Sequence, residues 1–156
     1  MKVLNFIIIL LFLGLVSCSD SANLSQLNSI DYKTKEERVE ILKKEIKFFS
    51  NFEDAEFELF NVNGFSNGRI DLPGPSSWNY RFVIKVKPSD INKWTKGMVK
   101  MEFDNYDTQW MRKITEERKG VWKTETAPEF YTRKGERVFM AVYRFEGIVF
   151  KSIVNL

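Results

Sequence analysis

The side chains that carry most known catalysis are nearly absent from this sequence. Its 156 residues include no histidine and a single cysteine, Cys18. Without histidine, the chain can form neither a Ser-His-Asp triad nor an imidazole metal site. Carboxylates, lysine, tyrosine, serine and threonine are the groups that remain for chemistry. The composition therefore excludes most enzyme classes, and we expect no catalytic residue, no metal site and no cofactor.

The densest group of carboxylates comprises Glu102, Asp104 and Asp107. Retaining and inverting glycosidases need two carboxyl groups about 5 to 10 Å apart across a cleft. No spacing in this stretch indicates a cleft, and acids that follow one another in a loop are more often solvated. A carboxylate-dependent enzyme acting on cell-envelope glycan is therefore an alternative interpretation and not the leading one.

The chain opens with a charged residue and an apolar run that ends just before the cysteine. Lys2 precedes an uninterrupted apolar stretch of 11 residues, 6–16, which is the pattern of an export signal. The four residues LVSC at 15–18 resemble the lipobox of bacterial lipoproteins, in which small residues precede an invariant cysteine. Two alternatives are a transmembrane helix, which needs about 20 apolar residues, and an ordinary secretory signal in which Cys18 falls by chance.

The resemblance implies a covalent membrane anchor at Cys18. In the family, a diacylglyceryl group is attached to this cysteine, the leader is cut before it and the new amine is acylated. Two or more acyl chains hold a protein stably at a membrane, whereas one is marginal. A lipidated Cys18 supplies neither a thiolate nucleophile nor a zinc ligand. Ser19 resembles the residue found here in lipoproteins sent to the outer membrane, so a Gram-negative cell would hold the domain on its periplasmic face.

The mature chain is expected to be one domain of nearly balanced charge. We assign residues 1–17 to the signal peptide, 18–33 to a polar tether and 34–156 to a single domain. Only Lys2 leaves with the leader, so 23 of the 24 basic residues and all 21 acidic residues remain, a formal charge of +2. That balance argues against nucleic acid as a partner.

Basic residues nevertheless gather in the middle of the chain. They form either a surface that faces anionic lipid or an acidic partner, or the internal complement of the acidic first half. We favour the internal complement. The six residues concerned are Lys93, Lys96, Lys100, Arg112, Lys113 and Lys119.

Local patterns predict a helix followed by a strand hairpin. A capping box that begins at Thr34, with apolar residues at three- and four-residue spacing after it, predicts a helix over 34–49. Residues 55–62 and 80–87 alternate between apolar and charged side chains, as strands with one buried face do. The first strand is acidic and the second basic, so we expect them to pair antiparallel with opposite charges facing each other.

The connection 64–77 is the candidate recognition loop. It is rich in Gly, Ser, Asn and Pro, and structureless connections of this length are usually functional or mobile. We expect Arg69, Trp78 and Tyr80 to bind a protein or glycan partner there. The alternative is that Trp78 covers the core and the loop is merely long.

The remaining elements are shorter. Residues 88–97 and 107–119 are predicted to contain short helices. The further strand candidates are 98–104, 121–124, 129–133, 137–145 and 148–154. The expected fold class is α+β: a mainly antiparallel sheet of about five or six strands, with the 34–49 helix packed on one face and short helices in the middle connections.

These features favour a binding or interaction domain held in the bacterial envelope by its lipid. The partner class is left open between a protein, as for an inhibitor or immunity-type protein, a glycan and a small ligand. A structural envelope component is the remaining alternative.

Replacing Cys18 tests the anchor. Cys18→Ser removes the only thiol to which lipid can be attached, so we expect the domain to move from the membrane fraction to the soluble fraction. Cell fractionation followed by immunoblotting measures the shift. Ser17→Ala keeps a small residue before the cysteine and should stay with the membrane. Unchanged membrane association of the Cys18→Ser chain would contradict the lipoprotein interpretation.

Overall fold

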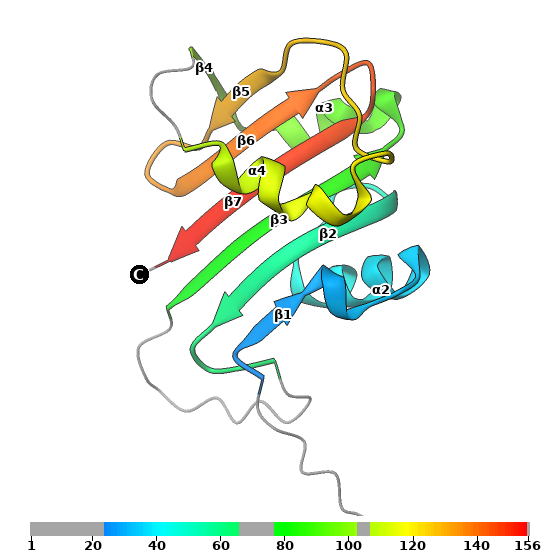
Figure 1. The fold of residues 1–156 in the computed structure, drawn as a ribbon. Coiled ribbons are helices and arrows are strands. Elements are labelled where there is room, and N and C mark those ends of the chain that lie inside the picture. The colour runs from blue at the N-terminus through cyan, green and yellow to red at the C-terminus, as the bar shows by residue number, and fades with distance from the viewer. Residues whose placement is uncertain (1–23, 66–76, 103–106, 156) are drawn as a thin grey trace, which may run out of the picture.

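One seven-stranded sheet forms the centre of the fold (Figure 1). The computed structural model describes residues 24–65, 77–102 and 107–155. The strand order is β1-β2-β3-β7-β6-β5-β4, and every neighbouring pair is antiparallel. The strands are β1 (Gln26–Asn28), β2 (Phe52–Asn61), β3 (Trp78–Val86), β4 (Val99–Met101), β5 (Glu129–Thr132), β6 (Arg137–Tyr143) and β7 (Ile148–Asn155). Within the described ranges, no helix has the length and apolar character needed to cross a membrane.

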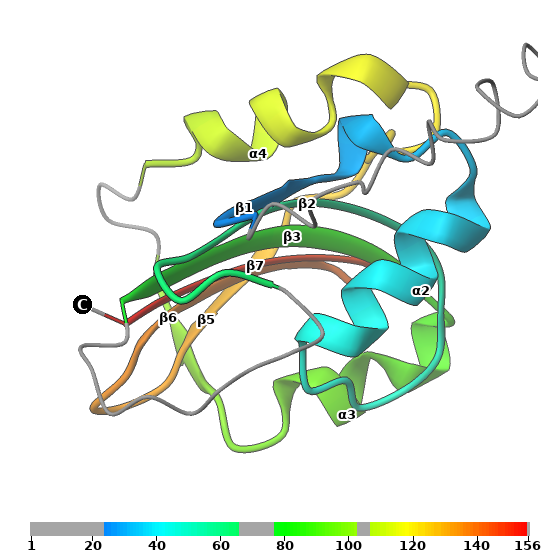
Figure 2. The ribbon, with the colours of Figure 1, turned by 90° about the horizontal axis from the view of Figure 1, so that it is seen from below.

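Helices lie on both sides of the sheet. α2 (Lys35–Glu45) and α3 (Ile91–Thr95) lie on one side, and α4 (Gln109–Ile114) crosses the other (Figure 2). We call these sides the α2 face and the α4 face. Three 3-10 turns accompany them: η2 (Ser29–Asp31), η3 (Pro88–Asp90) and η4 (Glu116–Arg118). The predicted α+β class with a mainly antiparallel sheet is confirmed, although helices cover both faces rather than one.

The helix α2 begins with a reciprocal capping box. Oγ1 of Thr34 accepts the backbone N–H of Glu37 at 3.2 Å, and Oε2 of Glu37 accepts the N–H of Thr34 at 3.1 Å. These bonds satisfy two N–H groups at the helix start. The helix ends earlier than its apolar spacing predicts, because Ile46 is extended. The extended segment brings Phe49 against Trp94 of α3, with ring centroids 5.3 Å apart.

Apolar side chains are buried on both faces, so the sheet separates two cores. On the α2 face, Leu42 of α2 and Trp94 of α3 are completely buried together with inward-facing residues of β2 and β3. On the α4 face, the helix packs on β3, β6 and β7. This second core comprises Val83, Trp110, Met111, Ile114, Trp122, Phe139, Ala141, Ile148 and Phe150.

The structure contradicts two predictions, one of a tether and one of a strand. Composition places residues 18–33 in a tether, but residues 26–28 form β1, pair with 58–60 of β2 and bury Leu27. Edge pairing and burial of one leucine are enough to hold this polar segment on the sheet. Residues 121–124 form no strand, because Trp122 turns into the core of the α4 face. The sheet has seven strands rather than five or six because β1 joins its edge.

The tight turn between β6 and β7 needs its glycine. Gly147 has a φ of 68°, in the left-handed region that favours glycine. A Cβ at this position would collide with the carbonyl oxygen of Val86. The N–H of Val86 donates to the carbonyl of Gly147 at 2.8 Å, so the turn also fixes the end of β3.

A lysine is buried in the core of the α2 face. Lys151 of β7 lies between Phe82 of β3 and Met140 of β6 and is only 5% exposed. Its amine makes no hydrogen bond or ion pair with the described part of the chain and lies 5.5 Å from the ring centroid of Phe49. Burial disfavours the charged form and lowers the pKa of this amine to about 8.

Lys151→Met measures the free-energy cost of this burial. Between about pH 8 and 10.5 the unfolded chain holds a proton here that the folded chain has lost, so the free energy of unfolding rises with pH. Below that window the folded chain buries a charge. We therefore expect Lys151→Met to raise the free energy of unfolding at pH 7 by about 1–3 kcal/mol and to flatten its rise with pH.

Urea denaturation at several pH values across this window measures both effects. Lys134→Met, which replaces an exposed lysine in the turn between β5 and β6, is the control and should leave the pH profile unchanged. A Lys151→Met chain less stable than the parent at pH 7 would contradict the argument.

Candidate functional site

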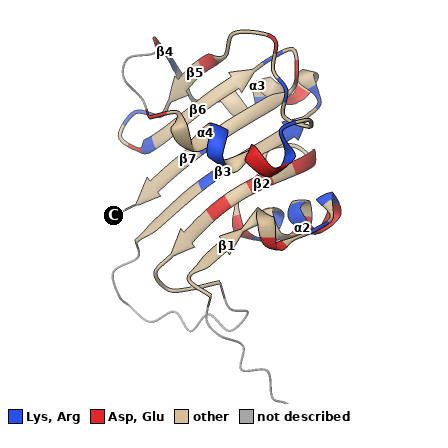
Figure 3. Cartoon of the chain, viewed as in Figure 1, with Lys and Arg blue, Asp and Glu red and all other residues tan. Residues whose placement is uncertain are grey.

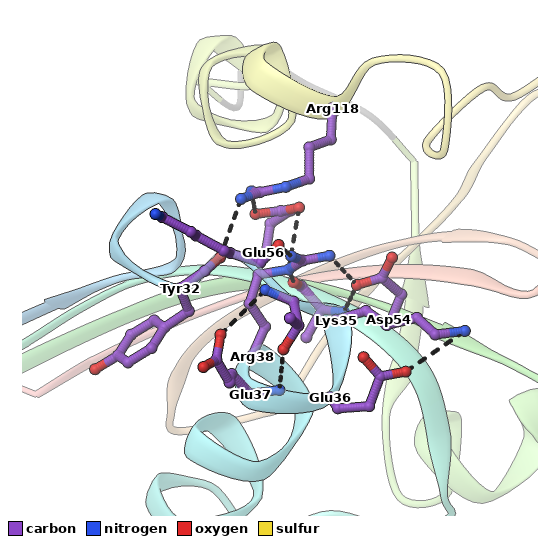
Figure 4. A network of polar contacts seen from close by, with 11 residues as sticks. Tyr32, Lys35, Glu36, Glu37, Arg38, Asp54, Glu56 and Arg118 are labelled. Carbon is purple, nitrogen blue, oxygen red and sulfur yellow. Dashed lines mark hydrogen bonds and ion pairs between the residues drawn. The ribbon is translucent and has the colours of Figure 1, made fainter.

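A buried network of two arginines and two carboxylates joins β2 to both helix layers (Figure 4). Nη2 of Arg38, in α2, donates to Oδ1 of Asp54 at 2.7 Å, and its Nε lies 3.5 Å from Oε1 of Glu56. From the opposite face, Nη1 of Arg118 donates to Oε2 of Glu56 at 2.8 Å. Nη2 of Arg118 also donates to the carbonyl of Tyr32 at 3.1 Å. Glu56 is 1% exposed, so it is a buried charge shared by two guanidinium groups.

The same network covers the unpaired part of β2. β1 pairs only with residues 58–60, so the edge of residues 52–57 has no neighbouring strand. At Ala55, Nε of Arg38 donates to the carbonyl at 2.9 Å, and Oδ1 of Asp54 accepts the N–H at 2.8 Å. An open strand edge is a template for pairing with another chain. Charged groups therefore occupy the hydrogen-bonding positions that a partner strand would use.

Buried titratable groups often mark an active site, but structural ion pairs perturb such groups as well. Here each carboxylate already faces a guanidinium, which stays charged at every accessible pH. Among the described residues there is no cluster of three or more acidic, histidine or cysteine side chains that could hold a metal ion. We interpret this network as structural.

Arg38→Met tests that interpretation. The substitution leaves Asp54 without its guanidinium and Glu56 with only one, and breaking a buried ion pair costs about 3–5 kcal/mol. We expect the free energy of unfolding, measured by urea denaturation at pH 7, to fall by about that amount. Lys44→Met in the same helix removes the exposed partner of Glu40 and should change it by no more than about 0.5 kcal/mol. Small and equal effects of the two substitutions would contradict a structural role.

A second polar cluster, near the β4 edge of the sheet, also has its charges paired within the chain. Glu129 of β5 accepts hydrogen bonds from Lys100 at 2.9 Å, from Arg144 at 2.7 Å and from the hydroxyl of Tyr131 at 2.8 Å. These bonds, that of Lys100 foremost, lower the pKa of Glu129 to about 2. A carboxyl group with so low a pKa is a poor general acid near neutral pH.

Acidic residues of β2 pair with basic residues of the helices and turns and not with those of β3. β2 and β3 pair antiparallel as predicted, with Glu58 opposite Arg81. Glu58 nevertheless binds Lys113 of α4, with Nζ and Oε1 3.3 Å apart. Figure 3 shows where the acidic residues of β2 and the basic residues of α4 lie along these two elements. The predicted pairing of strands is confirmed, but the predicted charge partners are wrong.

The six basic residues of the middle of the chain do not form one surface. Some lie on α3 and β4, and others lie on α4 and beside η4. Four of them form ion pairs: Lys93 with Asp90, Lys100 with Glu129, Lys113 with Glu58 and Lys119 with Glu116. These pairs favour internal complementarity over a basic docking surface.

The predicted recognition residues lie at the start of β3. Tyr80 is buried in the α2-face core, and half-buried Trp78 packs against that core, with their ring centroids 5.0 Å apart. Arg69 and Cys18 lie outside the described residues. Trp78 therefore packs on the core, as the alternative interpretation has it, and Tyr80 is part of that core.

A different part of the sheet carries polar groups without partners. The strand register sets six residues of the α4 face side by side on six strands. In sheet order they are Asn28, Glu58, Arg81, Ser152, Phe139 and Thr132. The next row, about 7 Å along the strands, runs from Val83 through Phe150 to Ala141 and is buried in the α4-face core. The α4 face thus changes from apolar to largely polar within two residues.

Two cavities open over this polar row, and Arg81 lines both. The first, about 400 Å³, lies beside Trp110 of α4 and over β3, β7, β6 and β5; we call it the Arg81 cavity. Its other lining residues are Asp107, Thr132, Glu136, Arg137, Val138, Phe139, Ser152 and Val154. The second, about 390 Å³, lies over β1, β2 and β3 and has mainly polar walls, with Asn79 and Lys113 among them.

Two polar atoms at these cavities are buried without partners. Nε of Arg81 and Oδ1 of Asn79 make no hydrogen bond, and they are two of the four such side-chain atoms in the described part of the chain. Within that part no carboxylate pairs with Arg81, whose guanidinium lies 5.9 Å from the ring centroid of Trp110. A buried donor without a partner costs free energy, and more so when it is charged. A polar ligand in the cavity would reduce this cost.

Sequence reasoning missed Arg81 because nothing near it in the chain distinguishes it. In the alternating pattern of 80–87 it is one of several basic residues on the outward side of a strand. The rest of its cavity comes from β5, β6, β7 and α4. Only the insertion of β7 beside β3 brings these segments together.

A third cavity, about 540 Å³, is lined by residues of α4 together with Trp122, Tyr143 and Phe150. The indole Nε1 of Trp122 is buried there without a hydrogen bond. Leaving a neutral N–H unpaired costs less than leaving a charge unpaired. The Arg81 cavity is therefore the stronger candidate for a ligand site.

Comparisons with other proteins do not assign this chain to a family. None of the protein-family models, curated proteins or solved structures compared with this chain matches it. What the chain binds is therefore argued from its own residues.

Proposed function

We propose that this chain is a binding protein of the bacterial cell envelope, held at a membrane by lipid on Cys18, that takes a small ligand into the Arg81 cavity. The observation that carries the proposal is the cavity of about 400 Å³ beside an aromatic ring and a guanidinium that has no carboxylate partner among the described residues. Ligand sites are typically concave, about 300–1,000 Å³ in volume, and mostly apolar with a few polar groups that fix orientation. In a Gram-negative cell, the domain would face the periplasm from the outer membrane.

Among the partner classes that the sequence leaves open, a small ligand fits the described residues best. A protein or glycan at residues 64–80 would rely on exposed aromatic side chains, whereas Trp78 and Tyr80 pack on the core. The Arg81 cavity is lined by residues of four strands and one helix, and sites on such elements hold their geometry better than sites on loops.

The alternative of a carboxylate-dependent enzyme has less support. Glu102 and Asp107 are both exposed, and Oδ1 of Asp107 accepts the N–H of Gln109 at 2.9 Å. Asp104 lies outside the described residues. Glu136, the other acid that lines the Arg81 cavity, pairs with Arg133 at 3.3 Å. A cavity of about 240 Å³ is lined by four glutamates, but three of them, Glu56, Glu58 and Glu116, are each paired with a cation. Glycoside hydrolysis needs one carboxyl group that can carry a proton, and ion pairs of this kind favour the ionised form.

The position of β1 limits the distance between the domain and the membrane. Gln26 begins β1, so only eight residues lead from Cys18 to the fold. Fully extended, they span at most about 28 Å. The domain would therefore work close to the lipid surface, on ligands that lie near it.

Photo-crosslinking in the intact envelope tests the binding function. Val154 lines the Arg81 cavity, so we expect Val154→p-benzoylphenylalanine to capture the ligand on irradiation and to add a defined small mass to the purified chain. Intact-protein mass spectrometry measures that mass.

The matched control is Lys96→p-benzoylphenylalanine, at an exposed residue that follows α3 and lines none of these cavities. Equal adducts at both positions, or none at position 154, would overturn the proposal that the Arg81 cavity binds a ligand.

A further inference from the structure

We infer that the ligand of the Arg81 cavity is a small organic anion, with a carboxylate or phosphate group held by Arg81 and a flat apolar body held against Trp110. This inference rests on the proposed binding function and specifies its ligand class. It follows from the charge, the lining and the size of the cavity.

The charge of the cavity is positive once internal ion pairs are removed. Glu58, the cross-strand neighbour of Arg81, is held by Lys113, and Glu136 is held by Arg133. Oδ1 of Asp107 accepts the N–H of Gln109. What remains in the described lining is the guanidinium of Arg81 and that of exposed Arg137, neither of which pairs with a carboxylate there, and the exposed carboxylate of Asp107, which together give a net charge of +1. A guanidinium binds carboxylates and phosphates through paired N–H donors, so an oxyanion is the complementary group.

The lining beside the charge is apolar and partly aromatic. The ring of buried Trp110 lies under the guanidinium of Arg81, 5.9 Å from it. Such a contact orients the guanidinium and leaves its outward N–H groups available. Phe139 is 6% exposed, and Val154 is half-buried. A ligand that is anionic throughout would leave this apolar surface unused, whereas one with a flat apolar body would cover it.

The strand register and α4 also explain why the guanidinium of Arg81 has no carboxylate partner among the described residues. Arg81 stands in the first polar row, directly beside the apolar row that contains Val83 and Phe150. Glu58 lies opposite Arg81 in the register but is held by Lys113, and Asp107, which lines the same cavity, accepts the backbone N–H of Gln109. α4 supplies both the cation that takes Glu58 and the ring that supports Arg81. One short helix thus keeps the guanidinium unpaired and in place.

Three probes with the same ring system and different charge test the inference on the whole chain. They are 1-naphthoate, 1-naphthyl phosphate and neutral 1-naphthamide, each titrated by isothermal calorimetry. We expect at least one of the two anions to bind at least tenfold more tightly than the amide. A preference for the carboxylate or for the phosphate identifies which oxyanion the site takes, and either one supports the inference.

Substitutions at Arg81 assign the effect to this side chain. Arg81→Gln should weaken binding of the preferred anion at least tenfold and leave the amide unchanged, while Arg81→Lys should retain part of the preference because the charge remains. Lys96→Gln makes the same change of charge at a residue outside the three cavities and should leave all affinities unchanged. Circular dichroism establishes that each variant is folded, and the comparison of probes on the parent chain does not depend on any variant.

The outcomes separate this inference from the binding function on which it rests. Equal affinity for the amide, unchanged anion affinity in Arg81→Gln, or no binding of any probe would overturn the anion class. If crosslinking at position 154 still captures a ligand in that case, the binding function stands. If crosslinking also fails, both proposals fall.

Discussion

The fold depends on one buried carboxylate, that of Glu56. It lies in β2 between Arg38 from the α2 face and Arg118 from the α4 face, and so it links α2 to η4. Glu56 has both arginine partners only when both helix layers are in place. Losing either arginine would be strongly destabilising, because it would leave buried charge uncompensated. The network also covers the strand edge that β1 leaves open. The same network of ion pairs therefore links the helices to the sheet and protects the open edge of β2.

The α4 face shows how a small domain combines a core with a cavity. Where apolar rows lie under α4, the helix and the sheet exclude water and contribute hydrophobic stabilisation. Where the row turns polar at Arg81, the same helix offers Trp110 as a wall and engages Glu58 through Lys113. A buried polar group without a hydrogen-bond partner is rare in native structures and calls for a specific explanation, of which a bound ion is one. Arg81 and Asn79 lie in this one region, which is why we place the ligand there.

The Arg38 network, the polar cluster around Glu129 and Lys151 all contain charged residues that the fold removes at least partly from water, but their physics differs. The first two satisfy each charge internally and stabilise the chain. Lys151 has no polar partner among the described residues and is forced toward its neutral form by burial. Arg81 cannot lose its proton in this way, so an external anion is the remaining route to compensation. That contrast separates a tolerated core lysine from a candidate ligand-binding arginine.

Part of this structure follows from the sequence alone. The capping box at Thr34 and the hairpin of β2 and β3 were both predictable, because each depends on residues within one local segment or two adjoining ones. The lack of histidine and the resemblance around Cys18 limit the chemistry and predict the location in the same local way. The tertiary structure alone decided that residues 26–28 join the sheet, that Glu56 binds two arginines and that Arg81 borders a cavity. These features depend on partners from distant segments, such as Arg118 and Glu56, which are 62 residues apart. These contacts contribute to stability only once the strand order has formed, so no local sequence pattern predicts them.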